Sequence, residues 1–595
     1  MNTRPAHDPS QLHREGLLDP SGGPEISHDG TGRVRLQFLP MDREVRVPPG
    51  VTVFDAASWN GIAIDSTCGG HGTCKKCRVR VAGGSIPVSR LDVRCFTADE
   101  LGDGWRLACL AGAVTDVTID VPPLSTRPKA ATVGVGRQVI LRPAIQKRYV
   151  ELAEPSLSDQ RPDLVRLLDA IDDLELRADL HALRRLPQIL RAANFAVTAV
   201  IVDDLLIDVE PGDTTARRYA IAYDLGTTTV VATLLDTATG TPAAVASMLN
   251  RQQPFGADVI TRISATMMDP STLGRLRAAA QETLAELAVE VCAEAGVDPT
   301  EVYEVALAGN ATMTALVLGV DPEPLGVAPF VQTAASWPGL SAADLGVPVH
   351  PAAPAVIFPA LGAYVGGDIV AGMLASGMDR DKRLRLFVDV GTNCEIVLGD
   401  GERILATAAP AGPAFEGGAI RCGMRAADGA IEVVKLIEDT VDLQVIGDVE
   451  AAGLCGSGLV DVVSELVRWH LVDATGRLVS PEIAKEIAPG LADRFRSVGD
   501  ERVFVLAWRG VEVVDSVYLS QRDIRELQFA KAAIATGWTL LLEELGVEPG
   551  DLQQVLLAGS FGSYLSPASA VRIGLVPKLS VLRIVSAGNV AGEGA

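Results

Sequence analysis

The sequence lacks the features expected of a membrane-embedded or secreted protein. No apolar run of 18 residues occurs among its 595 residues, and the first five residues, MNTRP, contain no apolar signal core. A membrane span needs about 20 apolar residues and a secretory signal a shorter apolar core, so we expect neither. Nine cysteines in so long a chain do not suggest a disulfide framework, which fits a reducing compartment. We therefore expect a cytoplasmic protein.

The sequence is also short of positive charge. Its 52 Lys and Arg residues against 75 Asp and Glu residues give a net charge of -23. The phosphates of nucleic acids and the headgroups of anionic membranes would repel such a chain, so we expect neither as a partner. At roughly 150 residues per domain, the length predicts three or four domains with ample core.

Four of the cysteines stand in the order C-x5-C-x2-C, then 31 further residues and a fourth cysteine: Cys68, Cys74, Cys77 and Cys109. Thiolates at this spacing can hold a 2Fe-2S cluster, and the glycines of segment 68–77, CGGHGTCKKC, let backbone N–H groups surround the sulfur acceptors. Zinc and a redox dithiol are the alternatives for Cys74 and Cys77. Zinc sites usually pair one short cysteine motif with a second, however, whereas Cys109 stands alone. We therefore predict a cluster and an electron carrier, with Cys95 as an ordinary half-buried thiol.

The residues around these cysteines predict a small β domain over 33–122. Segments 33–39 and 44–47 alternate apolar and polar residues, with a turn at 40–43, which is typical of a hairpin. Thr52 can cap a helix over 53–59, and 114–121 is expected to be a closing strand. Hairpin, helix, cysteine loop and closing strand in this order resemble a β-grasp ferredoxin, and the five-residue gap resembles its adrenodoxin-like branch.

Composition divides the rest of the chain. Residues 1–32 are rich in Pro, Gly, Ser, His and Asp without a period, which predicts a disordered tail, and residues 123–137 begin with a Pro-rich stretch typical of a linker. Residues 138–212 are expected to form a small, helix-rich α/β middle domain with a strand near 197–202. This middle domain carries no chemical motif. Residues 217–595 remain as the largest domain.

The large domain carries one motif twice. Asp224 closes an apolar strand before Gly226, Thr227, Thr228 and Thr229, and about 165 residues later Asp389 stands in the same way before Gly391, Thr392 and Asn393. A turn of small residues presents N–H and hydroxyl groups to phosphate oxygens, and an aspartate at a strand end can hold a hydrated Mg²⁺ ion. A third element, VLLAGSFG over 555–562, runs from a strand into a turn at Gly559 and Ser560, where a backbone can pass close to an adenine or a ribose.

These three motifs, in this order, resemble the phosphate-1, phosphate-2 and adenosine motifs of the actin, heat-shock chaperone and acetate/sugar kinase superfamily. The resemblance implies two duplicated lobes of ribonuclease-H-like topology that clamp Mg-ATP between them, with Asp224 and Asp389 as the magnesium-side carboxylates. Asn310 lies where the first connecting segment of that superfamily is usually found. It is expected either to approach the γ-phosphate or to cap a helix over 311–318. No residue is identified as a general base.

A ferredoxin joined to such an ATPase in one chain resembles the reductive activators of corrinoid-dependent methyltransferases. The resemblance runs from about residue 33 to the C-terminus and includes stretches 256–263, 309–313, 412–418, 454–459 and 588–592. It implies ATP-dependent one-electron reduction of an inactive Co(II) corrinoid to Co(I) through a 2Fe-2S cluster. The implied partners are a corrinoid-binding protein or cobalamin-dependent methyltransferase and a low-potential electron-donor reductase, and a homodimer stays open. The sequence departs from relatives at its end, because it stops directly after 588–592, where they continue into a helix.

Other classes of function remain as alternatives. The large domain could be a small-molecule kinase with a fused ferredoxin, or a nucleotide-binding docking scaffold for a plain electron carrier. The presence of both Asp224 and Asp389 counts against the scaffold. A dehydratase-type activator is a further alternative, but such activators have no ferredoxin domain. Three more cysteines, Cys394, Cys422 and Cys455, form no short ligand pair and are expected to be buried thiols rather than ligands of a second cluster.

Overall fold

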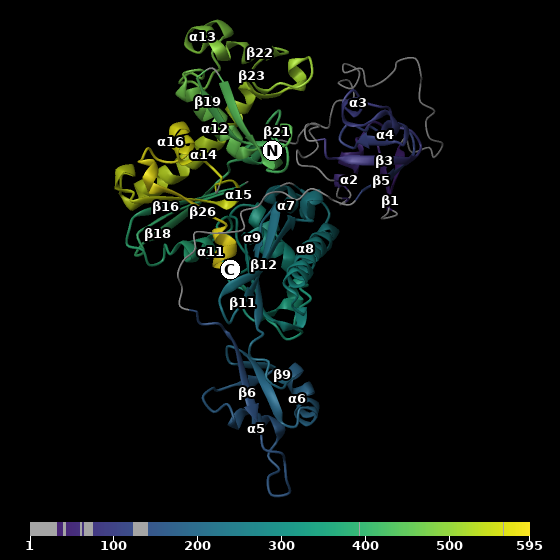
Figure 1. Ribbon diagram of the computed structural model, residues 1–595, viewed down its shortest axis with the longest axis vertical. Helices are drawn as coiled ribbons and strands as arrows, with labels where there is room; N and C mark the ends of the chain where they lie inside the picture. The colour runs from purple at the N-terminus through teal and green to yellow at the C-terminus, as the bar shows by residue number, and fades with distance from the viewer. Residues whose placement is uncertain are drawn as a thin grey trace.

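The computed structural model describes residues 33–39, 43–59, 62, 64, 75–122, 141–256, 258–391, 393–438, 440–562 and 564–595. Along the chain these residues form a small N-terminal domain, a linker domain and two larger lobes, with the linker domain and lobe II at opposite ends of the molecule (Figure 1). The predicted tail over 1–32 and the predicted linker over 123–137 lie outside the described residues. None of the helices in the described ranges is both long and apolar enough to cross a membrane.

The N-terminal domain is a five-stranded sheet in the order β2-β1-β5-β3-β4, in which β1 runs parallel to β5. Its elements are β1 (Val34–Leu39), β2 (Arg43–Val47), α2 (Val53–Trp59), β3 (Arg78–Gly83), α3 (Asp92–Cys95), α4 (Ala98–Gly102), β4 (Trp105–Leu107) and β5 (Val117–Asp120). The hairpin and the helix over 53–59 are confirmed, and the Thr52 hydroxyl caps α2 by accepting from the Asp55 N–H at 3.0 Å. The closing strand is shorter than expected. The result is the β-grasp order of elements.

The linker domain is a four-stranded sheet, β6-β8-β9-β7, with two helices. Its elements are β6 (Ile145–Glu151), α5 (Asp163–Asp169), β7 (Arg177–Ala178), α6 (Leu180–Ala192), β8 (Ala196–Val202) and β9 (Leu205–Pro211). The strand expected near 197–202 is confirmed as β8. The expectation of a helix-rich region was wrong, because β6 pairs with β8 along its whole length and β9 pairs with β8 on the other side.

Lobe I is built on a six-stranded sheet in the order β12-β11-β10-β13-β15-β14. Its strands are β10 (Tyr219–Leu225), β11 (Thr229–Asp236), β12 (Thr241–Leu249), β13 (Val302–Gly309), β14 (Leu340–Ser341) and β15 (Pro354–Ile357). Its helices are η1 (Gln253–Phe255), α7 (Val259–Met268), α8 (Ser271–Ala295), η2 (Pro299–Glu301), α9 (Ala311–Leu318), α10 (Glu323–Gly326), η3 (Ala342–Leu345) and α11 (Gly367–Ser376). The apolar faces of β10, β11 and β13 pack with α8 and α9 in one core.

Lobe II repeats this plan with the five-stranded sheet β18-β17-β16-β25-β26. Its sheet strands are β16 (Arg385–Val390), β17 (Cys394–Gly399), β18 (Ile404–Ala409), β25 (Gln554–Ala558) and β26 (Ile584–Gly588). Its helices are η4 (Pro413–Glu416), α12 (Gly456–Arg468), α14 (Gln521–Leu545), η8 (Pro549–Asp551), α15 (Gly559–Gly562), α16 (Pro567–Ile573), η9 (Val581–Arg583) and α17 (Val590–Gly594). In each lobe three antiparallel strands are followed by a strand parallel to the first. This duplicated topology confirms the expected ribonuclease-H-like lobes.

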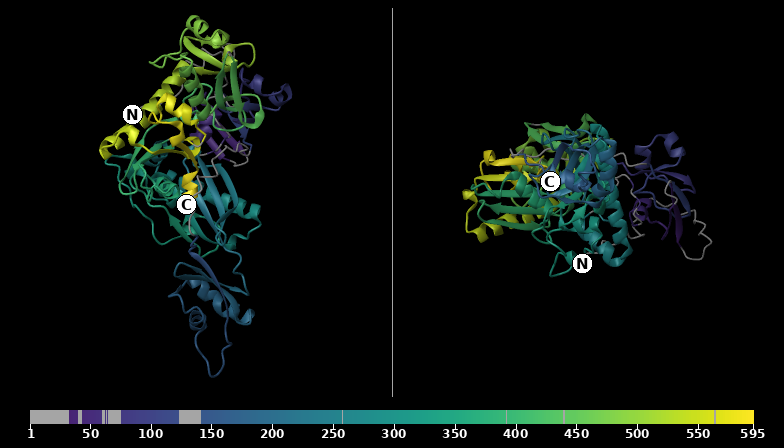
Figure 2. Two further views of the ribbon diagram at one scale, coloured as in Figure 1. Left: turned by 60° about the vertical axis from the view of Figure 1, so that its left-hand side comes forward. Right: turned by 90° about the horizontal axis from the view of Figure 1, so that it is seen from below.

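Lobe II also carries an insertion of two small sheets, β20-β19-β21 and β22-β23-β24. Its elements are β19 (Ala430–Ile437), β20 (Thr440–Val445), η5 (Ile446–Asp448), β21 (Gly453–Leu454), α13 (Pro481–Ile487), η6 (Pro489–Arg494), β22 (Phe495–Val498), β23 (Glu501–Ala507), η7 (Val513–Asp515) and β24 (Val517–Ser520). In Figure 1 and in the left view of Figure 2, this insertion forms the end of the molecule opposite the linker domain.

The two lobes are held together by helices that cross between them. Ile369 and Met373 of α11, a lobe I helix, pack in one core with Phe387 of lobe II. Residues that follow β26 form α17, which packs against α11 so closely that a Cβ atom on Gly594 would lie 2.1 Å from the Ala371 carbonyl oxygen. The last segment of the chain therefore forms part of the junction between the lobes.

Candidate functional site

The end of β10 forms the first wall of a cavity between the lobes. A Cβ atom on Gly226 would lie 2.4 Å from the Thr229 carbonyl oxygen, so the turn closes only with glycine there. Behind the turn, Asn250 donates to the Gly226 carbonyl oxygen at 2.9 Å and Arg262 donates to the Thr227 carbonyl oxygen at 2.6 Å. Because C=O and N–H point oppositely in a trans peptide, these bonds turn the following N–H groups away from the two side chains. The turn is thereby arranged to bind an anion from its open side.

The second wall comes from lobe II, where β16 carries Asp389 and the following turn carries Gly391 and Asn393. The third expected motif starts α15 beside it: Gly559 has φ +86° and lies against Asp389. Thr392 lies outside the described residues, as does the side chain of Ser560. The three motifs, distant in sequence, therefore meet around one cavity.

The cavity is lined by residues of both lobes. They are Asp224, Gly226, Thr227, Thr228, Thr229, Val231, Asn310, Asp368, Asp389, Gly391, Asn393, Glu395, Gly559, Asn589, Val590 and Ala591. Asn310 caps α9 as one of its two expected roles, because its Oδ1 accepts from the Met313 N–H at 2.9 Å, and its Nδ2 donates to Thr227 Oγ1 at 3.1 Å. Asn310 thus ties a helix start to the first turn.

Four carboxylates converge in this cavity, two more than the sequence motifs indicated. Asp368 comes from the first turn of α11, and Glu395 stands on β17 directly opposite Asp389 in the hairpin register. Sequence reasoning missed both as site residues. The hairpin spacing could have revealed Glu395, because two acids placed opposite each other in antiparallel strands repel and need a reason to be there.

Burial, and for three of the four the charge of neighbouring carboxylates, raises the pKa values of these groups. Burial, then the charge of Asp368, raises the pKa of Asp224 to about 7, although a hydrogen bond from Asn589 lowers it. Burial, then Asp368 and Asp224, raises the pKa of Asp389 to about 8, and burial raises that of Asp368 to about 6. The pKa of Glu395 is also raised, by burial and then by Asp368 and Asp389. Such a group of oxygen ligands favours a hard divalent cation such as Mg²⁺, which would offset the mutual repulsion.

In the N-terminal domain, two of the four expected cluster ligands are described. The sulfur atoms of Cys77 and Cys109 lie 3.2 Å apart, both are buried, and neither forms a disulfide. Cys68 and Cys74 lie outside the described residues. Two buried sulfur atoms brought together from positions 32 apart fit a cluster with thiolate ligands. Cys95 is half-buried, as expected, and burial is the main reason that its pKa is raised.

Three further cysteines, Cys394, Cys422 and Cys455, were expected to be buried thiols. Each approaches a different backbone carbonyl oxygen, with Cys394 near Gly391, Cys422 near Ser516 and Cys455 near Ile431. All three are buried, and burial raises the pKa of Cys422 to about 12. These properties fit the expectation of buried thiols.

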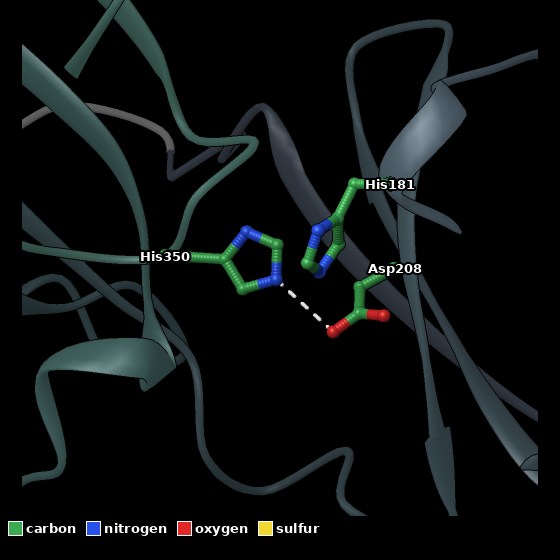
Figure 3. A group of neighbouring side chains, drawn as sticks. All are labelled: His181, Asp208 and His350. Atoms are coloured by element: carbon green, nitrogen blue, oxygen red, sulfur yellow. Dashed lines mark hydrogen bonds and ion pairs between the residues drawn. The ribbon is translucent and has the colours of Figure 1, made fainter. Parts of the chain in front are cut away.

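One other group of potential metal ligands, His181, Asp208 and His350, lies where the linker domain meets lobe I (Figure 3). His350 Nε2 lies 3.0 Å from Asp208 Oδ2, while its Nδ1 accepts from the Ala352 N–H at 3.2 Å. The ring must therefore carry its proton on Nε2, the atom that faces Asp208, whereas a metal-bound histidine donates its other N–H outward. Arg185 also binds Asp208. The group is better explained as a hydrogen-bonded contact between the two domains than as a metal site.

Fold and site together define a class of protein: an iron-sulfur domain of the β-grasp type fused to a two-lobed domain of the actin, chaperone and kinase type. Family models match the whole arrangement: a 2Fe-2S iron-sulfur cluster binding domain over 37–114, the RACo linker region over 134–216, the RACo middle region over 219–381, and the C-terminal ASKHA domain of RACo over 383–595. The chain belongs to the RACo family of reductive activators of corrinoid proteins.

Individual relatives cover nearly the full length. The corrinoid activation enzyme RamQ of Eubacterium limosum is 32% identical over 567 residues, 94% of this chain and 92% of the relative. The solved structure of a reductive activator for a corrinoid, iron-sulfur protein is 33% identical with a TM-score of 0.69, covering 94% of this chain and 91% of that one. The [Co(II) methylated amine-specific corrinoid protein] reductase of Methanosarcina barkeri is 29% identical over 238 residues, 39% of this chain and 42% of the relative. The comparisons confirm the family expected from the sequence.

Proposed function

We propose that this protein uses ATP to drive one-electron reduction of an inactive Co(II) corrinoid protein to the Co(I) state. Family membership and the activities named for its relatives support corrinoid activation. The observation that carries the proposal is that Asp224 and Asp389 reach one cavity from two lobes, in a chain that also buries the Cys77 and Cys109 thiols side by side. The chain thus contains both an electron-transfer part and a nucleotide-binding part.

In the cavity, Asp224 and Asp389 would hold a hydrated Mg²⁺ ion from opposite sides. Bound Mg²⁺ supplies charge neutralisation for the phosphates of ATP. The first turn would bind phosphate oxygens through its N–H groups, with the Asn310 side chain fixed beside Thr227. Gly391 and Asn393 would bind from lobe II, and Gly559 would leave room for the nucleoside. Because the site belongs to both lobes, binding would draw them together.

Cys68, Cys74, Cys77 and Cys109 would hold the 2Fe-2S cluster. When bound, it supplies one electron at a time at a potential near about -400 mV, the value typical of plant-type centres. Each roughly 59 mV of uphill gap to cobalt costs a factor of ten in a one-electron equilibrium. An uphill transfer therefore needs an input, which lobe closure can provide by binding the Co(II) protein in one state and releasing it in another. A low-potential reductase would reload the ferredoxin domain.

The test is an anaerobic assay with the cluster-loaded protein, a chemical reductant and a purified Co(II) corrinoid protein. We expect the Co(II) absorbance and EPR signal to disappear when Mg-ATP is added, and to persist with ADP. A rate that does not depend on nucleotide would support the docking-scaffold alternative. Transfer of the γ-phosphate to a metabolite would support the kinase alternative.

A further inference from the structure

The ferredoxin domain touches both lobes of the ATPase. Its helix α2 lies against η1 (Gln253–Phe255) of lobe I, and Arg94 in its helix α3 forms an ion pair with Asp515 in η7 of the lobe II insertion. Figure 1 shows the domain beside the ATPase. A domain that rests on two lobes cannot keep both contacts unchanged when the lobes move relative to each other.

The contact with lobe II is an ion pair between oppositely charged side chains. The Asp515 side chain is only 14% exposed, although it lies in a surface turn, whereas the Arg94 side chain is 41% exposed. Exposed ion pairs are weak between separate molecules. Here both partners belong to one chain, and covalent attachment raises the effective concentration of the second surface to about the millimolar range. A contact with a dissociation constant of about 1 mM would therefore hold the domain about half of the time, and the ion pair contributes to it together with the packing of α2 on η1.

This contact lies close to Cys77, one of the expected cluster ligands. Arg94 is followed by Cys95, whose thiol is close enough to Cys77 and to Arg509 of the lobe II insertion for both to act on it electrostatically. Arg509 is itself held by Glu450 at 2.8 Å. In the docked arrangement the part of the domain around Arg94 and Cys95 therefore faces the insertion of lobe II.

A fully buried arginine links η1, the lobe I segment that the ferredoxin domain contacts, to the first turn of the cavity. Arg262 of α7 donates to the Thr227 carbonyl oxygen at 2.6 Å, to Gln252 Oε1 at 3.0 Å and to the Gly256 carbonyl oxygen at 3.0 Å. Thr227 belongs to the first turn of the cavity, while Gln252 and Gly256 flank η1, on which the ferredoxin helix rests. One rigid guanidinium group thus holds both segments, which gives a direct path between them.

We propose that the ferredoxin domain docks across both lobes through Arg94–Asp515 and η1, and that Arg262 couples this docking to occupation of the nucleotide cavity. Nucleotide binding would shift the first turn and the lobes, and thereby change how firmly the ferredoxin domain is held. Coupling is reciprocal, so docking must change nucleotide affinity by the same factor, which is typically 5–150-fold between coupled sites. The docking part stands by itself, whereas the coupling part rests on the proposed binding of nucleotide.

The docking part is tested by charge reversal in the full-length, cluster-loaded protein. Arg94→Glu and Asp515→Arg should each increase hydrogen exchange in η7, α2 and η1, because both remove the ion pair. The double variant, which restores the pair in reverse, should regain the protection. Arg80→Glu is the matched control, because it makes the same charge change at an arginine that pairs with Asp120 inside the ferredoxin domain. Single variants that exchange like the wild-type protein would overturn the docking.

The coupling part is tested by binding of a non-hydrolysable ATP analogue with Mg²⁺. The single variants should shift the dissociation constant at least fivefold and the double variant should restore it, since the coupling is reciprocal. In an Arg262→Lys background the same charge reversals should no longer shift it, because one ammonium nitrogen cannot reach the separate acceptors that the Nε, Nη1 and Nη2 atoms of the guanidinium group bind. Lost protection with unchanged affinity would overturn the coupling. A wild-type protein that binds no nucleotide would instead refute the proposed function, while the exchange experiment would still report on docking.

Discussion

Gly559 and Asp389 fit together so closely that a Cβ atom at position 559 would lie 2.3 Å from Asp389 Oδ1. The two residues stand at the ends of neighbouring parallel strands, because Asp389 pairs with Ala558 in the register of β16 and β25. Gly559 also has φ +86°, which L side chains rarely adopt. The space that one glycine leaves is therefore occupied by a carboxylate of the cavity.

Replacing Gly559 with alanine should disable the cavity. The added methyl group must displace either the Asp389 carboxylate or the start of α15, and the backbone conformation costs about 1–3 kcal/mol for a non-glycine residue. We expect ATP hydrolysis to fall at least about tenfold and the unfolding temperature to decrease, while the ferredoxin cluster is retained. ATPase assays and calorimetry measure both effects.

Gly212→Ala is the matched control for this prediction. Gly212 has φ +70°, so alanine meets a similar backbone cost, but apart from its chain neighbours no residue has a heavy atom within 4 Å of the added methyl group. This variant should lose stability and keep ATPase activity. Equal activity in Gly559→Ala would show that the contact with Asp389 does not matter for hydrolysis.

The carboxylates of the cavity should make stability depend on pH and on Mg²⁺. The pKa values of Asp368, Asp224 and Asp389 are raised to about 6, 7 and 8, so the native state keeps protons that the unfolded state releases above about pH 4. In a chelator the free energy of unfolding should therefore decrease as the pH rises from about 4 to 8, by up to about 1.4 kcal/mol per pH unit for each proton kept. Mg²⁺ binds the ionised carboxylates, so it should stabilise the protein most above about pH 7.

Asp389→Asn provides the comparison, because it removes one titrating group and leaves the other carboxylates with a lower total charge. Its free energy of unfolding in chelator should depend less steeply on pH than that of the wild-type protein. Denaturant unfolding at several pH values, with and without Mg²⁺, measures these slopes. Identical slopes in the two proteins would mean that Asp389 is ionised in the cation-free cavity.

Much of the cavity could be predicted because its first parts are local in sequence. An apolar strand that ends in an acidic residue and a glycine turn can be recognised from the local sequence alone. The repetition of this motif at Asp224 and Asp389 indicated two lobes. Asp368 could not be found in this way, since it reaches the cavity from a helix start whose position depends on tertiary packing. A Cβ atom on Gly366 would lie 2.4 Å from Asn310 Cα, so it is the close approach of two helix starts that places Asp368 there.

The linker domain shows the opposite case. The sequence indicated a helix-rich region with one strand, and β6 (IQKRYVE) has too mixed a pattern to be recognised as a second strand. Its pairing with β8 supplies the missing information. The contact between His350 and Asp208 could not be predicted either, because the two residues belong to different domains and lie 142 positions apart.

The cluster ligands are tested by single replacements. Protein purified without oxygen should contain two irons and two sulfides, and should show the EPR signal of a reduced 2Fe-2S centre. Cys68→Ser, Cys74→Ser, Cys77→Ser and Cys109→Ser should each lose this signal, whereas Cys95→Ser should keep it because the half-buried thiol is not one of the four. A normal cluster in Cys109→Ser would refute the ligand assignment.

The final prediction separates the two halves of the chain. Asp224→Asn or Asp389→Asn should leave the cluster and its reduction by a chemical donor unchanged, because the ferredoxin domain has its own core. Each variant removes one carboxylate from the expected Mg²⁺ site, a loss of charge stabilisation that commonly costs a hundredfold or more, on the order of 3 kcal/mol of barrier. ATP hydrolysis and ATP-stimulated loss of the Co(II) absorbance of a corrinoid partner should therefore both fall by that factor. If the variants activated the partner at the wild-type rate in the presence of ATP, electron transfer would not depend on the cavity, and the two lobes would serve only as a scaffold for the ferredoxin domain.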